Sequence, residues 1–300
     1  MKDYNLYVID RSYEGCELRT FLKRELKLSH RTLINLKKNN SMKVNGETAY
    51  TNTILKVGDR LEITLAEEES EGILPEPMEL DIVYEDEYMA VLNKPYNMPV
   101  HPTRRHYMGT LANGLVYHWM NRERSTVIRP VNRLDKDTSG LVVFAKNAHI
   151  QHLLSMNMAK PEFEKRYEAI VEGCVEICKG TINAPIAREY EGRVKRTVRE
   201  DGERAVTHYE LKEQLKDASL LDILLETGRT HQIRVHMSYI GHPLLGDDMY
   251  GGSLKHIHRH ALHAGSINML HPITNQWLYL KAELPEDMKN VIERLRERTL

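Results

Sequence analysis

The charged residues of this chain are sorted into blocks along the sequence, and this sorting most constrains how the chain folds. Between residues 19 and 43 there are eight basic residues and one acidic residue. Between residues 67 and 87 there are ten carboxylates and no lysine or arginine, together with glycine and proline. Such a run is typical of a solvated linker. The sequence therefore predicts three parts: a basic N-terminal module (1–65), an acidic linker (66–79) and a C-terminal domain (80–300).

Composition narrows the class of protein. A chain of 300 residues with 41% hydrophobic and 28% charged residues has room for about two globular domains. No apolar run approaches the ~20 residues that a membrane helix requires. Three cysteines are too few for a disulfide framework or for paired Cys-x-x-Cys zinc hooks. We therefore expect a cytoplasmic protein with no membrane partner and no structural metal, and we take a monomer as the starting assumption.

The basic module is predicted to contain two short helices followed by small strands. Apolar residues between 16 and 28 recur at near-helical spacing, and Ser29 can cap a second helix that begins near Arg31. The pair Asn45-Gly46 predicts a tight turn, and alternation within 57–65 predicts a strand.

Residues 14–65 resemble the alpha-L RNA-binding module found in a small-subunit ribosomal protein and in several RNA-modifying enzymes. The resemblance implies that basic side chains on the two helices neutralise RNA phosphates without reading bases. A solvated basic face with no ligand is the alternative. The RNA-binding candidates in this module are Lys23, Arg24, Arg31, Lys37 and Lys38.

The C-terminal domain mixes strands and helices without a regular alternation, which favours an α+β fold over a doubly wound sheet. It has no phosphate-cradling glycine loop and no dinucleotide fingerprint, so no nucleotide cofactor is expected. Strands are predicted at 80–85, 89–93, 141–145, 167–172 and 220–226, and helices around 148–158, 230–240 and 286–298.

Three places in this domain carry candidate chemistry. Asp135 lies in a polar loop before a strand, Tyr167 opens a strand, and Arg229 lies at a strand-to-helix corner, where the helix is capped near Thr230 and ends at Gly241. Each residue alone has an ordinary structural explanation: a turn aspartate, a packing tyrosine, or an arginine bonded to a neighbouring loop.

Together these motifs closely resemble the RluA-type family of pseudouridine synthases, from about residue 80 to the C-terminus. The motifs are Arg133-Leu-Asp135-x-x-Thr138-Ser139-Gly140, Lys165-x-Tyr167-x-Ala169, Gly228-Arg-Thr-His-Gln-Ile-Arg-Val-His236 and Gly241-His-Pro-x-x-Gly246-Asp247-x-x-Tyr250-Gly251. The resemblance implies the family's fold, with a mixed, mainly antiparallel central sheet flanked by helices and loops. It also implies a cofactor-free isomerisation of uridine in RNA.

The chain departs from the family pattern at two positions. Asn132 stands where the family usually has histidine, which puts in doubt any role for an imidazole at that position. Asn97 stands where the turn after Lys94-Pro usually has glycine. Asparagine tolerates left-handed backbone, so Asn97 is expected to keep the turn.

The resemblance also implies roles for the site residues. Asp135 is the expected nucleophile, and it can attack either the sugar carbon or the uracil ring. Arg229 is expected within salt-bridge range of Asp135, because a guanidinium can hold both carboxylate oxygens in one plane. Tyr167 is expected to stack near the base and is a candidate for accepting the ring proton.

RNA contacts are expected around the catalytic domain as well. A uridine must leave its stack at a cost of a few kcal/mol before it can react, and Arg133 is the expected helper, with a structural hydrogen bond to its own loop as the alternative. Arg193 and Arg196 lie in a second basic run that is either a phosphate-binding segment or a solvated hairpin.

Large-subunit rRNA is the expected substrate, because an alpha-L module ahead of the catalytic domain is typical of rRNA-directed members of the family; tRNA is the alternative. A non-catalytic RNA-binding or ribosome-assembly protein would need only the basic module, but it leaves the three matched motifs unexplained. A metal-dependent hydrolase could use the histidines at 256–263 together with His231 and His236. Neither His-Glu-x-x-His nor a cysteine pair supports one.

Overall fold

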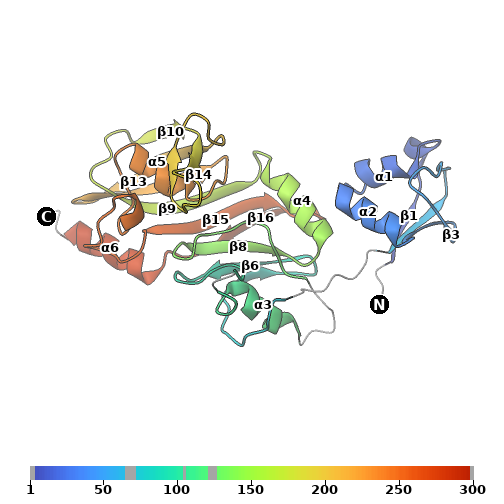
Figure 1. The fold of residues 1–300 in the computed structure, drawn as a ribbon, viewed down its shortest axis with the longest axis horizontal. Helices are drawn as coiled ribbons and strands as arrows, with labels where there is room; N and C mark the ends of the chain where they lie inside the picture. The colour runs from blue at the N-terminus through green and yellow to red at the C-terminus, as the bar shows by residue number, and fades with distance from the viewer. Residues whose placement is uncertain (1–3, 65–71, 104–105, 121–126, 298–300) are drawn as a thin grey trace.

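The N-terminal residues fold around a core of their own. The computed structural model describes residues 4–64, 72–103, 106–120 and 127–297 (Figure 1), so residues 66–71 of the predicted linker (66–79) lie outside the described part. The elements before the linker are β1 (Tyr4–Val8), a 3-10 turn (Arg11–Tyr13), α1 (Leu18–Arg24), α2 (His30–Lys38), β2 (Met42–Val44), β3 (Glu47–Thr48) and β4 (Arg60–Thr64).

The sequence signals for this module are confirmed. The hydroxyl of Ser29 accepts a hydrogen bond of 3.1 Å from the backbone N–H of Thr32 and caps α2. Asn45 and Gly46 both have positive φ, as a type I′ hairpin turn requires, and they connect β2 to β3. The strands form an antiparallel sheet in the order β1-β4-β2-β3. Apolar residues of α1 and α2 pack on this sheet, which leaves the basic side chains of both helices in solvent.

The remaining elements build a second, larger body. They are β5 (Ile82–Glu85), β6 (Met89–Lys94), α3 (Leu111–Met120), β7 (Arg129–Pro130), β8 (Ser139–Ala145), α4 (Ala148–Met158), β9 (Glu164–Glu172), β10 (Lys179–Asn183), β11 (Ile186–Arg188), β12 (Arg196–Val198), β13 (Val206–Gln214), β14 (Ala218–Leu225), α5 (Gln232–Tyr239), a 3-10 turn (Asp248–Tyr250), β15 (Leu262–Leu270), β16 (Trp277–Lys281) and α6 (Glu286–Glu297).

A ten-stranded sheet forms the centre of this body, in the order β10-β13-β14-β9-β15-β8-β6-β5 with β16 beside β15 and β7 beside β8. The pairing of β15 with β8 is parallel and the other pairings described in this sheet are antiparallel, so the predicted mixed, mainly antiparallel sheet is confirmed. At the parallel step, Gly140 has φ of +111°, and a Cβ there would lie 2.3 Å from the carbonyl oxygen of Ala264. Only glycine allows β8 to start this close to β15.

Alternate residues of each buried strand point to opposite faces of the sheet, so both faces carry apolar side chains. Helices cover these side chains on both faces. On β9, Tyr167 and Ala169 pack in the core that includes α5, whereas Ile170 packs in the core that includes α6. On β8, the odd-numbered residues Leu141 and Val143 share a core with α4, and the even-numbered ones share a core with α3. None of the helices in the described ranges has the length and apolar character of a membrane span.

Candidate active site

Asp135 lies in the loop between β7 and β8, and buried polar groups fix the backbone of this loop. Leu134 packs against the cores of both α3 and α5, which places the loop between these helices. The Nζ of Lys94 donates to the carbonyl of Lys136 at 3.0 Å, and Thr138 Oγ1 lies 2.7 Å from His260 Nε2. The Asp135 side chain itself stays 29% exposed. A rigid loop therefore holds a carboxylate that a substrate can reach.

The carboxylate of Asp135 pairs with a buried arginine on α5. Nη1 of Arg234 lies 3.1 Å from Oδ2 of Asp135. The other edge of this guanidinium is held by Asp247, with Nε–Oδ2 at 2.7 Å and Nη2–Oδ1 at 2.8 Å. Burial lowers the pKa of Arg234, but its hydrogen bonds to Asp247 and the nearby carboxylate charges outweigh burial and raise the pKa above the ordinary value. Arg234 is thus a permanent cation aimed at Asp135.

The prediction that Arg229 forms the ion pair with Asp135 is wrong, because Arg234 takes that place. Arg229 does lie at the corner between β14 and α5, but its Nη1 contacts Glu203 at 2.5 Å and its Nε donates to the carbonyl of Arg204 at 3.0 Å. The physical reason is the point at which the helix begins. Arg229 precedes the first turn of α5 and points outward, whereas Arg234 lies inside the helix on its buried side.

His231, which the sequence offered only as a possible metal ligand, also faces Asp135. His231 Nε2 lies 3.6 Å from Asp135 Oδ2, and burial lowers the pKa of His231, so the imidazole is neutral at neutral pH. His231 is the N-cap of α5, without a side-chain cap, and its φ of +58° is left-handed. The helix start predicted near Thr230 is therefore shifted by one residue. Left-handed backbone at a residue other than glycine costs energy and often marks a functional site.

Tyr167 lies within β9, opposite Ile223 of β14, and is buried. Burial, followed by the negative charge of Asp135, raises the pKa of the Tyr167 hydroxyl. The phenol is therefore neutral, and a neutral phenol has to lose its own proton before it can accept one. This weighs against Tyr167 as the proton acceptor for the ring carbon. It favours a role in packing against the uracil ring.

The residues at the two departures from the family pattern have structural roles. Asn132 is buried, and its side chain bridges to β8 by donating to the carbonyl of Leu141 and accepting from the N–H of Val143. Asn97 adopts φ of +59°, which confirms the expected left-handed turn. Next to this turn, Lys94 is fully buried and donates to three backbone carbonyls, and burial lowers its pKa to about 7.

The predicted RNA-binding residues are exposed or partly exposed. Arg133 is exposed two residues before Asp135, and Arg193 is exposed in the hairpin between β11 and β12. Arg196 lies half-buried on β12, and its buried Nε has no hydrogen-bond partner within the described ranges. The predicted RNA-binding residues of α1 and α2 are all exposed: Lys23, Arg24, Arg31, Lys37 and Lys38.

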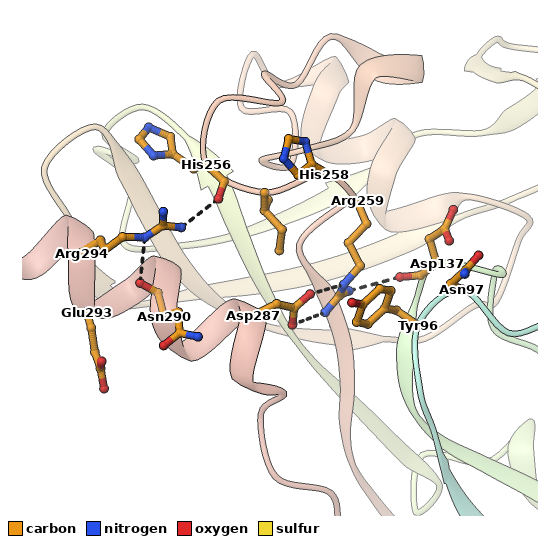
Figure 2. A pocket seen from close by; sticks show the side chains of 11 residues that line it. Tyr96, Asn97, Asp137, His256, His258, Arg259, Asp287, Asn290, Glu293 and Arg294 are labelled. Carbon is orange, nitrogen blue, oxygen red and sulfur yellow. Dashed lines mark hydrogen bonds and ion pairs between the residues drawn. The ribbon is translucent and has the colours of Figure 1, made fainter.

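A cavity of about 680 Å³ lies beside Asp137, in the loop that holds Asp135 (Figure 2). Its wall includes Asp137, the 256–259 segment and α6. Arg259 spans this wall: it binds both carboxylate oxygens of Asp287, stacks 4.8 Å from the ring centroid of Tyr96, and donates to the carbonyl of Asp137. Asp135 does not line this cavity, whereas Asp137 of the same loop does.

The histidine-rich segment that suggested a metal site is used for hydrogen bonding. His260 contacts Thr138, and burial lowers the pKa of His260 to about 2, while His263 contacts Ser139 at 3.0 Å. In the part of the chain that the structure describes, no three His, Cys, Asp or Glu side chains are grouped so that they could hold a metal ion.

Comparison with known proteins decides the family. Residues 88–239 match the family model of RNA pseudouridylate synthase. Residues 7–61 match the family model of the RluD ribosomal pseudouridine synthase N-terminal domain. YhcT of Bacillus subtilis, an uncharacterized RNA pseudouridine synthase, is 42% identical over 289 residues, which are 95% of each chain. The chain belongs to the RluA-type family of RNA pseudouridine synthases. As a member of this family it is an isomerase that converts uridine in RNA to pseudouridine.

Two further relatives of this pseudouridine synthase are informative. Ribosomal large subunit pseudouridine synthase D of Zymomonas mobilis is 44% identical over 236 residues, 74% of each chain. The structure of human RNA Pseudouridylate Synthase Domain Containing 4 superposes with a TM-score of 0.60 at 24% identity, covering 72% of this chain and 93% of that one. That likeness shows the fold.

Proposed function

We propose that this enzyme isomerises specific uridines of large-subunit rRNA, with Asp135 as the nucleophile. The observation that carries the proposal is the partly exposed Asp135 carboxylate, 3.1 Å from the buried Arg234 guanidinium. Ribosomal large subunit pseudouridine synthase D proteins are similar over both parts of the chain, which supports rRNA as the substrate. We also propose that 1–65 is an RNA-binding module, 66–79 a linker and 80–300 the catalytic domain, and that the enzyme works as a monomer in the cytoplasm.

The chemistry follows from the charges around Asp135. The carboxylate oxygen forms a bond either to the sugar carbon or to the uracil ring, and the bond between the sugar and the ring nitrogen breaks. The retained base turns, its ring carbon bonds to the sugar and loses its proton, the ring nitrogen freed from the sugar gains a proton, and the carboxylate is released unchanged. The guanidinium of Arg234, 3.1 Å from Oδ2 of Asp135, orients the carboxylate before attack and receives it again after release. No group outside the protein and the RNA is consumed.

RNA binding is assigned to the basic residues around this site. Arg133 lies in the same loop as Asp135 and is proposed to hold the flipped-out nucleotide, which offsets the unstacking cost of a few kcal/mol. Arg193 and Arg196 are proposed to bind backbone phosphates, and the exposure of Arg193 and the partial exposure of Arg196 support this role. The basic faces of α1 and α2 would add affinity without base specificity.

Mapping pseudouridines in total RNA from cells with and without this protein tests the proposal. We expect specific large-subunit rRNA sites to disappear without the protein and to return with the wild type but not with Asp135→Asn. Loss confined to tRNA sites would contradict the rRNA substrate. Restoration by Asp135→Asn would contradict the nucleophile.

A further inference from the structure

One buried tyrosine contacts both side chains that face Asp135. Tyr250 ends the 3-10 turn that follows Asp247, and its hydroxyl lies 2.8 Å from Nδ1 of His231. Its ring lies 5.0 Å from the guanidinium carbon of Arg234. A cation over an aromatic face is held by the ring quadrupole, so the ring restrains Arg234 on the side that Asp247 leaves open.

The hydroxyl of Tyr250 is also bonded to the basic hairpin. It accepts the backbone N–H of Arg196, on β12, at 2.9 Å. Because an amide nitrogen can only donate, the hydroxyl hydrogen is free to be donated to Nδ1 of His231. The proton of the neutral imidazole then sits on Nε2, the nitrogen 3.6 Å from Asp135. A hydrogen-bond chain thus leads from the hairpin backbone through Tyr250 to Nδ1 of His231, and Nε2 on the other side of the ring faces the carboxylate.

The backbone around Tyr250 keeps this arrangement rigid. The N–H of Tyr250 donates to the carbonyl of Asp247 at 3.1 Å, and the hydroxyl of Ser238 on α5 donates to the carbonyl of Tyr250 at 2.8 Å. The same short turn therefore supplies the carboxylate that holds Arg234 and the aromatic ring that packs on it.

We propose that Tyr250 is a positioning residue for Asp135, and that its hydroxyl connects the β11–β12 hairpin to the catalytic carboxylate through His231. The proposal rests on the proposed role of Asp135. Without the hydroxyl, the imidazole of His231 loses the hydrogen bond that fixes its ring and tautomer, while the phosphate-binding side chains on the hairpin surface stay in place. The turnover rate should therefore fall, and the affinity for RNA should stay the same.

Tyr250→Phe tests this, because it removes the hydroxyl and keeps the ring. We expect kcat to fall about 10- to 100-fold, the scale expected for a misplaced reacting group, with KM for RNA within about twofold of the wild type. The matched control is Tyr84→Phe on β5, which removes a hydroxyl that donates to Asp86 at 2.8 Å. This change should leave kcat and KM unchanged. Urea unfolding at the assay temperature verifies that each variant is folded.

A double-mutant cycle with His231→Ala separates positioning through His231 from a general structural effect. Since both changes remove the same link, the double variant should be no slower than His231→Ala alone. A wild-type kcat for Tyr250→Phe, or additive losses in the double variant, would overturn the inference. Asp135→Asn in the same assay separates the two proposals. An active Asp135→Asn enzyme refutes the nucleophile, whereas an inactive one beside a fully active Tyr250→Phe refutes only the role of Tyr250.

Discussion

Replacing Arg234 with methionine should damage both stability and turnover, and a second substitution should separate the two effects. Arg234 is 7% exposed and the side chain of its partner Asp247 is fully buried. Removing the guanidinium leaves a buried carboxylate without a cation, a defect that costs about 3–5 kcal/mol in buried ion pairs. Typical domains have about 5–15 kcal/mol of stability, so the variant should still fold but unfold at clearly lower urea concentration.

The double variant Arg234→Met/Asp247→Leu removes both buried charges. Replacing a whole buried pair by apolar residues is often neutral or stabilising, so most of the lost unfolding free energy should return. Turnover should not return, because Asp135 still lacks its cation. Turnover can be followed as tritium released from RNA labelled at the uridine ring carbon that loses its proton.

Arg229→Met is the matched control for this pair of variants. Its partner Glu203 is 70% exposed and Arg229 itself is 39% exposed, so losing this ion pair should cost at most about 1 kcal/mol. Turnover should stay far above that of Arg234→Met. A loss below about 1 kcal/mol for Arg234→Met, or recovery of turnover in the double variant, would refute the assignment of Arg234.

Three further predictions follow from the site and the basic helices. Burial lowers the pKa of Lys94 from 10.5 to about 7, so between these pH values the unfolded chain holds a proton that the folded chain lacks. The unfolding free energy of the wild type relative to Lys94→Met should therefore rise between pH 7 and 9, as measured by urea titration; a constant difference would contradict the burial argument. Tyr167→Phe should keep most of the tritium-release rate while Tyr167→Ala loses it, and equal losses would assign the chemistry to the hydroxyl. Lys37→Ala/Lys38→Ala should reduce the slope of log affinity against log salt by about 0.7–0.9 for each phosphate that the variant no longer neutralises, and an unchanged slope would show that these lysines do not touch RNA.

Local signals in the sequence predicted local structure well. The helix predicted around 148–158 is α4, the cap at Ser29 and the turn at Asn45-Gly46 form as expected, and Gly241 follows the end of α5 with φ of +87°. Each of these features depends on residues within one or two turns of each other. β15 was missed, although it is the neighbour of both β8 and β9, because histidine, glycine and asparagine interrupt its apolar pattern.

The site could be predicted only in part, because its contacts join residues that lie far apart in the sequence. The motifs located Asp135 and Tyr167, but the partners of Asp135 lie 96 and 99 residues further along the chain, at His231 and Arg234. Arg229 and Arg234 belong to the same motif, and the sequence does not show which of them faces the loop. That choice depends on where α5 begins and on which of its sides is buried, and both are set by tertiary packing.

The most direct test of the central claim compares two neighbouring aspartates. Asp135→Asn keeps the size of the side chain but removes the nucleophilic charge. Asp137→Asn makes the same change two residues away, at a residue that lines the neighbouring cavity. In a single-turnover assay with saturating enzyme, we expect no detectable pseudouridine with Asp135→Asn, RNA affinity within about twofold of the wild type, and near-normal conversion with Asp137→Asn. Conversion by Asp135→Asn at the wild-type rate would contradict the account.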